Sequence, residues 1–171
     1  MKRVAAIALA PLLLAAPAHA AMYGDTAACA PGAAAPALLV WFDGLKDRKG
    51  KIRLELFPSN DQDFLADDFV LEKAGKPFRR IELPTPASGP IALCIRAPAP
   101  GRYSFAIIHD RDGKRKFSFS SDGIGFPGNP KLGWGKPKAA KAAVALGDGV
   151  TEIHVRLNYF SGLGFSPIKE K

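Results

Sequence analysis

Histidine and cysteine, the residues that most often build metal centres and nucleophilic sites, are scarce in this sequence. The 171 residues include three histidines and two cysteines. They form neither a C-x-x-C nor an H-x-x-x-H spacing, which excludes the common zinc signatures. The G-x-S-x-G turn of serine hydrolases is absent as well. We therefore expect no metal and no cofactor, and we predict a protein that is not an enzyme.

Long apolar runs are also missing beyond the first twenty residues. A membrane-spanning helix needs about 20 consecutive apolar residues, so no transmembrane span is expected. Residues 1–20, MKRVAAIALAPLLLAAPAHA, have the charged start, the short apolar stretch and the A-x-A ending of a cleaved signal peptide. We predict an exported protein, periplasmic or secreted, whose mature chain starts near Ala21.

The charge balance is moderately basic. The chain has 24 lysines and arginines against 16 aspartates and glutamates, a net charge of +8. In an exported protein this excess favours an anionic partner in the cell envelope, such as an anionic glycan, a lipid surface or an envelope protein. Nucleic acid is not expected in that compartment. A charge that only maintains solubility explains the composition equally well, and no feature of the sequence specifies an oligomeric state.

Two cysteines, Cys29 and Cys94, are expected to form a disulfide, because an oxidising compartment favours that bond. Cys29 lies in a lead-in, residues 21–36, that is rich in alanine, proline and glycine. Alternation in the segment 90–97 directs Cys94 away from the apolar face of that segment, where the lead-in can reach it. The bond would close a loop of 65 residues, for which the chain-entropy model gives about 4 kcal/mol of stabilisation. The bond is predicted to tether the lead-in to the domain that follows.

The rest of the chain is dominated by short segments that alternate apolar and polar residues between glycine and proline turns. Residues 51–57, KIRLELF, alternate strictly, so that Arg53 and Glu55 are expected to point away from the core. The strands expected in this way are 38–43, 51–57, 78–83, 90–97, 102–110, 142–146 and 151–159. About seven such strands predict an all-β protein with a single antiparallel β-sandwich domain over residues 37–160, followed by a tail, residues 161–171.

Two segments do not follow the strand pattern. Residues 58–76 are acidic and predict a helical turn or a strand. Residues 121–138 contain five glycines and read as a long irregular loop. Aromatic rings among cations suit acidic sugars or lipid headgroups, which makes this loop a candidate ligand-binding surface. Its candidate residues are Phe126, Asn129, Lys131, Trp134 and Lys136. The alternative is that Phe126 and Trp134 fold back and close the end of the sandwich.

The stretch 105–119, FAIIHDRDGKRKFSF, begins like a calcium loop. Such a loop needs oxygen ligands at its first, third and fifth positions and a glycine at the sixth. Counted from Asp110, the fifth and sixth positions are Lys114 and Arg115, which would repel a cation. Asp112 followed by glycine is instead typical of a turn. The sequence therefore predicts a charged hairpin without a metal ion.

His109 and Asp110 end one of the expected strands. A histidine next to a carboxylate can serve as a general base, so a small periplasmic hydrolase that uses this pair is the alternative to a binding protein. A histidine at this position more often caps a turn or bonds to a loop backbone. Both residues therefore remain candidates for a ligand site.

The order of four motifs resembles an uncharacterised bacterial family catalogued as domain of unknown function 2141. The motifs are a Pro-Gly-x-Tyr turn, a strand that ends in His-Asp, a glycine-aromatic segment and a final strand. The matching residues are Pro100, Gly101, Tyr103, His109, Asp110, Gly123, Gly125, Phe126 and Asn129. The resemblance covers residues 37–160 and implies an exported sandwich of the transthyretin-like or immunoglobulin-like kind, with no established activity. Lys114, Arg115 and Ser118 replace asparagine, glycine and an acidic residue of the family loop, which argues against a metal role here.

Overall fold

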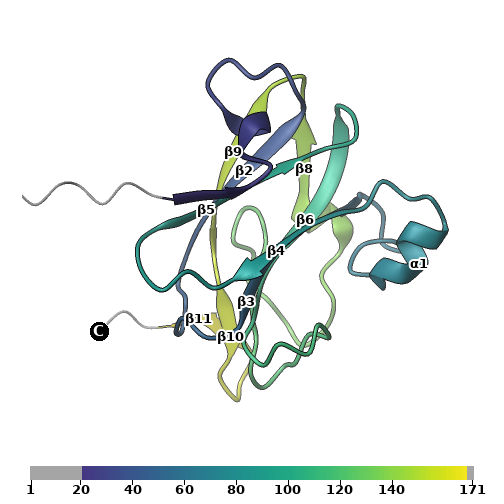
Figure 1. Cartoon of the computed structure of the whole chain (residues 1–171). Helices are drawn as coiled ribbons and strands as arrows, with labels where there is room; N and C mark the ends of the chain where they lie inside the picture. Colours follow the sequence, from purple (N-terminus) through teal and green to yellow (C-terminus); the bar gives the residue numbers. More distant parts are fainter. Residues whose placement is uncertain (1–20, 169–171) are drawn as a thin grey trace, which may run out of the picture.

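The computed structural model describes residues 21–168, which form two β-sheets packed face to face with one short α-helix at the side (Figure 1). The predicted signal peptide, residues 1–20, and the residues after Ile168 lie outside the described part. The prediction of a mostly β, sandwich-like fold is confirmed. No helix within residues 21–168 has the length and apolar character needed to cross a membrane.

Sheet A has four strands in the spatial order β1-β5-β2-β9. They are β1 (Ala21–Gly24), β5 (Ile91–Arg96), β2 (Ala37–Asp43) and β9 (Val150–Arg156). β1 runs parallel to β5, and β9 runs parallel to β2. The prediction of purely antiparallel sheets was therefore wrong for sheet A. Both parallel pairs join segments far apart in the chain, which provides the long connection that parallel pairing requires.

Sheet B is antiparallel, in the order β11-β10-β7-β6-β3-β4, and β8 pairs with the first half of β6. β6, the longest strand of the described chain with 10 residues, lies at its centre. The strands are β3 (Lys51–Pro58), β4 (Arg79–Pro84), β6 (Gly101–Asp110), β7 (Gly123–Gly125), β8 (Ala143–Leu146), β10 (Asn158–Phe160) and β11 (Phe165–Pro167).

β7 was not expected, because it lies in the glycine-rich segment that reads as an irregular loop. Close packing explains its glycines. A Cβ atom on Gly123 would lie 2.5 Å from the ring of Tyr159, and one on Gly125 would lie 2.5 Å from the side chain of Val155. Only residues without a side chain allow these approaches, so the short strand fits between β6 and β10.

The last predicted strand, 151–159, is divided between the two sheets. The chain leaves sheet A after Arg156 and joins sheet B at Asn158 as β10. β11 follows within the segment expected to be a tail and pairs with β10. The turn that joins β10 and β11 lies at the bottom of the view in Figure 1.

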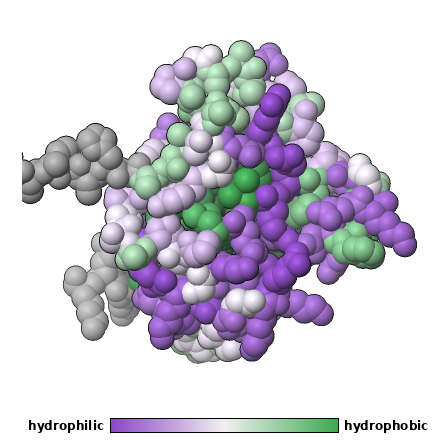
Figure 2. Space-filling view, in the orientation of Figure 1, coloured by the Kyte–Doolittle hydropathy of each residue, from purple (hydrophilic) through white to green (hydrophobic). Residues whose placement is uncertain are grey.

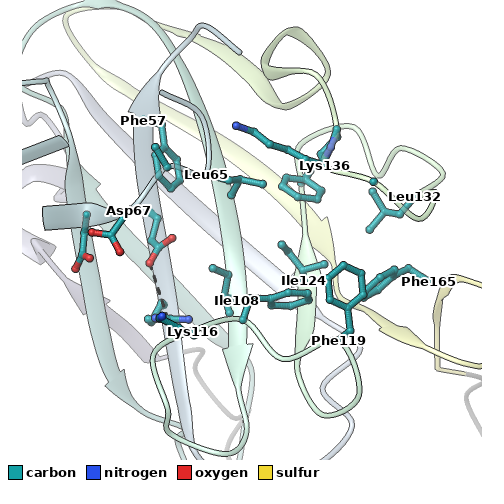
Figure 3. Close-up of a pocket in the computed structure, with 18 of the residues that line it drawn as sticks. Phe57, Leu65, Asp67, Ile108, Lys116, Phe119, Ile124, Leu132, Lys136 and Phe165 are labelled. Atoms are coloured by element: carbon teal, nitrogen blue, oxygen red, sulfur yellow. Dashed lines mark ion pairs between the residues drawn. The ribbon is translucent and has the colours of Figure 1, made fainter. Parts of the chain in front are cut away.

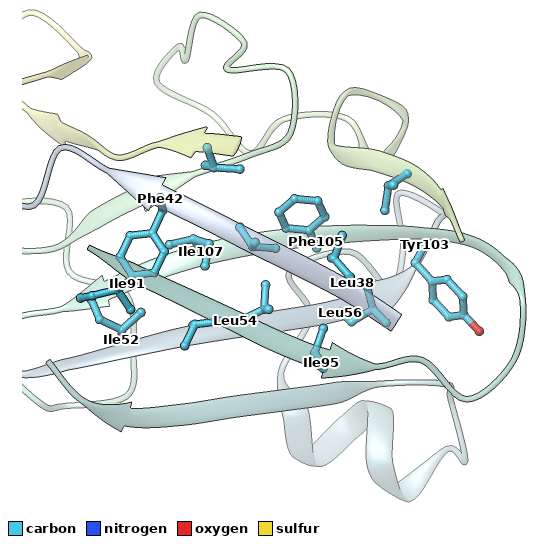
Figure 4. Packing of buried hydrophobic residues seen from close by; sticks show 14 of the residues in the cluster. Leu38, Phe42, Ile52, Leu54, Leu56, Ile91, Ile95, Tyr103, Phe105 and Ile107 are labelled. Atoms are coloured by element: carbon cyan, nitrogen blue, oxygen red, sulfur yellow. The ribbon is translucent and has the colours of Figure 1, made fainter. Parts of the chain in front are cut away.

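The main hydrophobic core lies between the sheets (Figure 4). The alternation in β3 is confirmed on this side, where Ile52, Leu54 and Leu56 are fully buried. Figure 2 shows hydrophobic side chains gathered at the centre of this face of the molecule, bordered by hydrophilic ones. Removing this apolar surface from water is the main stabilising contribution to the sandwich.

The outer face of sheet B, which points away from sheet A, is covered rather than exposed. Arg53 and Glu55, expected to point away from the core, are on this face and are only 2% and 5% exposed. Their direction is as expected, but their burial was not foreseen. It arises because the chain between β3 and β4, with helix α1 (Asp68–Lys73), and the chain between β6 and β8 pack over this face. A second hydrophobic cluster forms there, with Phe57, Phe64 and Phe126 among its buried members.

The predicted disulfide between Cys29 and Cys94 is confirmed, with the two Cα atoms 6.1 Å apart. Cys29 ends a short 3₁₀-helix (Thr26–Cys29) that lies against the outer face of sheet A. Cys94 points to this face, as expected, and is fully buried beneath the tethered segment. The disulfide therefore holds the lead-in against β5.

Candidate functional site

The cover over the outer face of sheet B encloses a pocket of about 460 Å³, which we call the outer pocket. This volume lies within the range of about 300–1,000 Å³ that is typical of small-molecule sites. Its apolar floor comes from strands β3, β6 and β7 and from the residue after β7: Phe57, Ile108, Ile124 and Phe126. Pairing places Ile108 beside Ile124 on the same face of neighbouring strands, so the floor is continuous.

One end of the outer pocket is charged. Arg80 of β4 donates to Glu55 at 2.8 Å and forms an ion pair with Asp68 at the start of α1. Asp68 also pairs with Arg115 at 2.7 Å. The Nε atom of Arg53 lies 3.9 Å from Oε1 of Glu55 and has no hydrogen-bond partner in the described residues. These groups come from four separate segments, and their ion pairs join those segments at one place.

The two carboxyl groups of this network have opposite pKa shifts. Burial raises the pKa of Glu55 above its ordinary value, although Arg80 and Arg53 act in the other direction. Burial also acts to raise the pKa of Asp68, but Arg80 and Arg115 together hold it below its ordinary value. Because arginines hold both carboxyl groups in place, these groups form a fixed part of the charged end of the outer pocket.

The other end of the outer pocket is aromatic. The ring of Phe119 lies 5.5 Å from Phe117 and 5.4 Å from Phe165 of β11, measured between centroids. Figure 3 shows this separation: Asp67 and Lys116 lie on one side of the pocket, and Phe119 and Phe165 on the other. The outer pocket is therefore amphipathic, with charged groups at one end and aromatic rings at the other.

Three residues proposed from the sequence lie at or near this pocket. Phe126 is 2% exposed, packs against Phe64 and forms part of the floor. Lys136 lines the rim, and its Nζ atom donates to the carbonyl of Asp61 at 3.0 Å. Trp134 is 66% exposed and lies outside the pocket, with its ring 5.2 Å from that of Phe160.

Asn129 and Lys131 line a different cavity, of about 760 Å³, beside Trp41 and Arg156. The Oδ1 atom of Asn129 accepts a hydrogen bond from the backbone N–H of Arg156 at 2.7 Å. Asn129 has a φ of 47°, which an asparagine tolerates better than most residues. The structure thus does not bring the five loop candidates together at one site.

His109 points into the sandwich and is fully buried. Its Nε2 atom lies 2.8 Å from the carbonyl oxygen of Lys49, and its Nδ1 atom lies 2.6 Å from the hydroxyl of Tyr159. Since a carbonyl only accepts, Nε2 carries the hydrogen and Nδ1 accepts from Tyr159. Burial lowers the pKa of His109 and raises that of Tyr159 to about 12. Each of these polar groups therefore has a hydrogen-bond partner, and the resulting neutral network links β6, β10 and the β2–β3 turn.

Asp110 points to the opposite face of β6 from His109, so the structure does not bring the predicted acid–base pair together. The carboxylate of Asp110 is buried and accepts hydrogen bonds from the backbone N–H groups of Gly113 and Arg115, at 2.8 and 3.1 Å. These bonds hold the tip of the charged hairpin in its conformation.

Carboxylate oxygens of Asp110, Asp112 and Asp122 lie within 4.8 Å of one another. Asp122 is fully buried and accepts from the N–H groups of Arg111 and Ser118, at 3.0 and 2.9 Å. Each of the three carboxylates accepts at least one backbone N–H, so the cluster already has a role in fixing the loop. Sequence reasoning overlooked Asp122, because its distance along the chain from Asp110 concealed their proximity.

The charged end of the outer pocket was also overlooked by reasoning from the sequence. Arg53 and Glu55 look like ordinary polar positions of a half-exposed strand, and Arg80 and Asp68 lie in other segments. The signal available was the acidic segment 58–76 together with basic residues in β4, but only the tertiary pairing shows which charges meet.

A family model described as "Uncharacterized protein conserved in bacteria (DUF2141)" matches residues 40–154. The match covers more than half of the chain and includes the floor and the charged end of the outer pocket. No curated protein and no solved structure matches the chain.

Proposed function

Since the chain belongs to the uncharacterised bacterial family DUF2141, no activity can be carried over to it, and we propose a function from the geometry. The protein is an exported, non-catalytic binding module of the cell envelope, and its outer pocket takes a small amphipathic molecule. The observation that carries this proposal is the pocket itself, with its apolar floor, aromatic end and charged end. A sandwich of the transthyretin-like or immunoglobulin-like kind is part of the same proposal.

Export is supported by the disulfide between Cys29 and Cys94. Such bonds persist in oxidising compartments and are rare where glutathione keeps thiols reduced. The signal-like composition of residues 1–20 points the same way.

A binding role is supported by the chemistry of the pocket lining. The described residues around the outer pocket include no histidine, serine, threonine, tyrosine or cysteine, so carboxylates and lysines are the groups of the lining that could take part in catalysis. Its carboxylates Glu55 and Asp68 are engaged by arginines. The hydrolase alternative finds no support in the geometry, because His109 and Asp110 point to opposite faces of sheet B.

The test is binding of 8-anilinonaphthalene-1-sulfonate, a fluorescent molecule with an apolar aromatic body and an anionic group. Ala66 lines the pocket and is half-buried, so Ala66→Trp would fill the cavity without removing a contact. The matched control is Ala140→Trp, at an exposed position away from the lining. Near-UV circular dichroism verifies that each variant is folded.

We expect saturable fluorescence enhancement with the parent and with Ala140→Trp, and an affinity reduced at least about tenfold in Ala66→Trp, equivalent to about 1.4 kcal/mol. Equal binding by Ala66→Trp and the parent would refute the outer pocket as the site. No binding by the folded parent would refute a pocket for this class of molecule.

A further inference from the structure

Two apolar side chains project from loop tips, and each is placed between two glycines. Trp134 lies between Gly133 and Gly135, and Leu163 lies in the Gly-Leu-Gly turn that joins β10 and β11. The indole is 66% exposed and the leucine 94% exposed. A Cβ atom built on any of the four flanking glycines would meet no atom within 4 Å. Both tips therefore extend away from the body of the protein.

The two tips belong to one continuous surface. The ring of Trp134 packs against Phe160, and Phe160 pairs with Phe165 across the turn that carries Leu163. The ring centroids of Phe160 and Phe165 are 5.9 Å apart. Phe119, which is half exposed, contacts Phe165 on the other side. We call the surface formed by Phe119, Trp134, Phe160, Leu163 and Phe165 the aromatic ridge.

Exposed large apolar side chains are few elsewhere in the described chain. Of six such residues, three lie on the aromatic ridge. The other three are Phe69 and Val70 on helix α1 and Val150 at the start of β9. Figure 2 shows hydrophobic atoms at the right, where Figure 1 places α1. Helix α1 thus provides a comparison surface of similar exposure at a different place.

The chain segment that carries two residues of the ridge is positively charged. Residues 111–138, which carry Phe119 and Trp134, contain seven lysines and arginines and two aspartates. Lys116 and Lys131 are exposed and have no ion pair within residues 21–168. Anionic headgroups attract such cations over a distance of about one Debye length. A cationic surface with apolar tips is therefore complementary to an anionic membrane.

The shape of the ridge favours a lipid surface over a folded protein. Protein interfaces depend on close fit around buried anchors, whereas here two side chains flanked by glycines project from neighbouring turns. Tryptophan is enriched at the level of lipid headgroups, where its ring is half buried and half hydrated. A projecting leucine gains most by entering the adjacent acyl region.

We propose that the aromatic ridge docks the protein onto the surface of an anionic lipid membrane, with Trp134 at the level of the headgroups and Leu163 in the adjacent acyl region. This interaction goes beyond binding in the outer pocket. Phe119 and Phe165 belong both to the ridge and to the pocket lining, so docking brings the aromatic end of the pocket close to the membrane.

The test is co-sedimentation of the purified protein with two kinds of vesicle, one of phosphatidylcholine alone and one containing phosphatidylglycerol. The ridge variant is Trp134→Ser/Leu163→Ser. The matched control is Phe69→Ser/Val70→Ser, which removes two exposed apolar residues from α1. All four positions are exposed, so each variant is expected to fold, and thermal unfolding verifies this.

We expect the parent and the α1 control to bind the phosphatidylglycerol vesicles, and the ridge variant to bind about tenfold more weakly or worse. Phosphatidylcholine vesicles are expected to bind poorly, and Lys116→Glu/Lys131→Glu should reduce binding to the anionic vesicles. In a Trp41→Phe background, where Trp134 is the only tryptophan, its fluorescence emission should shift to shorter wavelength on binding.

Three results would overturn this proposal. They are the absence of parent binding to anionic vesicles, equal binding by the ridge variant, and an equal loss in the α1 control. The outer pocket is tested independently, because Ala66→Trp changes binding of the fluorescent sulfonate and leaves the ridge intact. Failure of one proposal is thus distinguishable from failure of the other.

Discussion

The hydroxyl of Tyr159 donates a hydrogen bond to Nδ1 of His109 across 2.6 Å of protein interior. The same oxygen accepts from the backbone N–H of Lys46 at 3.1 Å. One phenol thus satisfies the buried imidazole of β6 and a backbone N–H of the turn after β2. This arrangement makes the histidine at the end of β6 a structural residue, and it leads to the first prediction.

Tyr159→Phe should destabilise the protein by about 1–3 kcal/mol, because it leaves the buried Nδ1 atom of His109 without a partner. Urea unfolding measures the change. The control is Tyr103→Phe, whose hydroxyl donates only to the carbonyl of Ala99 at 2.9 Å and should cost about 1 kcal/mol. Equal losses in the two variants would contradict the special role of Tyr159.

The buried histidine should make stability depend on pH. Burial lowers the pKa of His109, and the carbonyl of Lys49 and the carboxylate of Asp47 offset this only partly. Below the ordinary histidine pKa of about 6.5 the unfolded chain therefore binds a proton that the folded chain rejects. Stability should fall as the pH drops below that value, until the lowered pKa of the folded state is reached.

Urea unfolding at a series of pH values tests this dependence. Glu55 titrates in the opposite sense, because its raised pKa weakens the folded state as the pH rises above the ordinary glutamate value. The comparison is therefore between the parent and His109→Gln, which should lose the histidine contribution. His154→Gln, at an exposed histidine, should retain the parental profile. An unchanged slope in His109→Gln would contradict the assignment.

Gly123→Ala should destabilise the fold by about 1–3 kcal/mol, the usual cost of overpacking a well-packed site. The added methyl group would lie 2.5 Å from the ring of Tyr159, so β10 or the ring must shift. Gly133→Ala, where a Cβ meets open space, should change stability by at most about 0.5 kcal/mol. Denaturant midpoints of the two variants measure the difference, and similar values would show that the sheet adapts freely at β7.

Arg80→Met should cost about 3–5 kcal/mol, because it removes the closest cation from the buried carboxylate of Glu55. Adding Glu55→Gln to the same chain should recover much of the loss, since the uncompensated buried charge is then gone. Chemical unfolding of both single variants and the double variant measures the coupling. Additive losses would show that the two residues do not depend on each other.

Much of the sandwich could be predicted from local pattern. The period-two alternation of residues 51–57 reflects the geometry of a strand, whatever lies around it, and it correctly placed Ile52, Leu54 and Leu56 in the core. The pairing of Cys29 with Cys94 followed because no other cysteine is present. The turn after Asp112 followed from residues that accept the required backbone angles.

The candidate site was harder to predict from the sequence. Phe126, Lys136 and the neighbouring glycines were recognised as unusual, but the sequence did not distinguish the buried Phe126 from the exposed Trp134. Both are aromatic residues in a glycine-rich loop. Their exposure is decided by whether the chain before α1 packs against them, as Phe64 does against Phe126.

The sequence alone therefore determined the features that depend on local pattern or on composition. These are the strongly alternating strands of sheets A and B, the turns and the single possible disulfide. The tertiary structure decided which distant segments meet. It placed β9 parallel to β2, inserted β7 between β6 and β10, and covered Arg53 and Glu55 with two long connections. The physical reason is that alternation separates the two faces of a strand but does not specify what packs on each, and the outer pocket exists only where such distant segments come together.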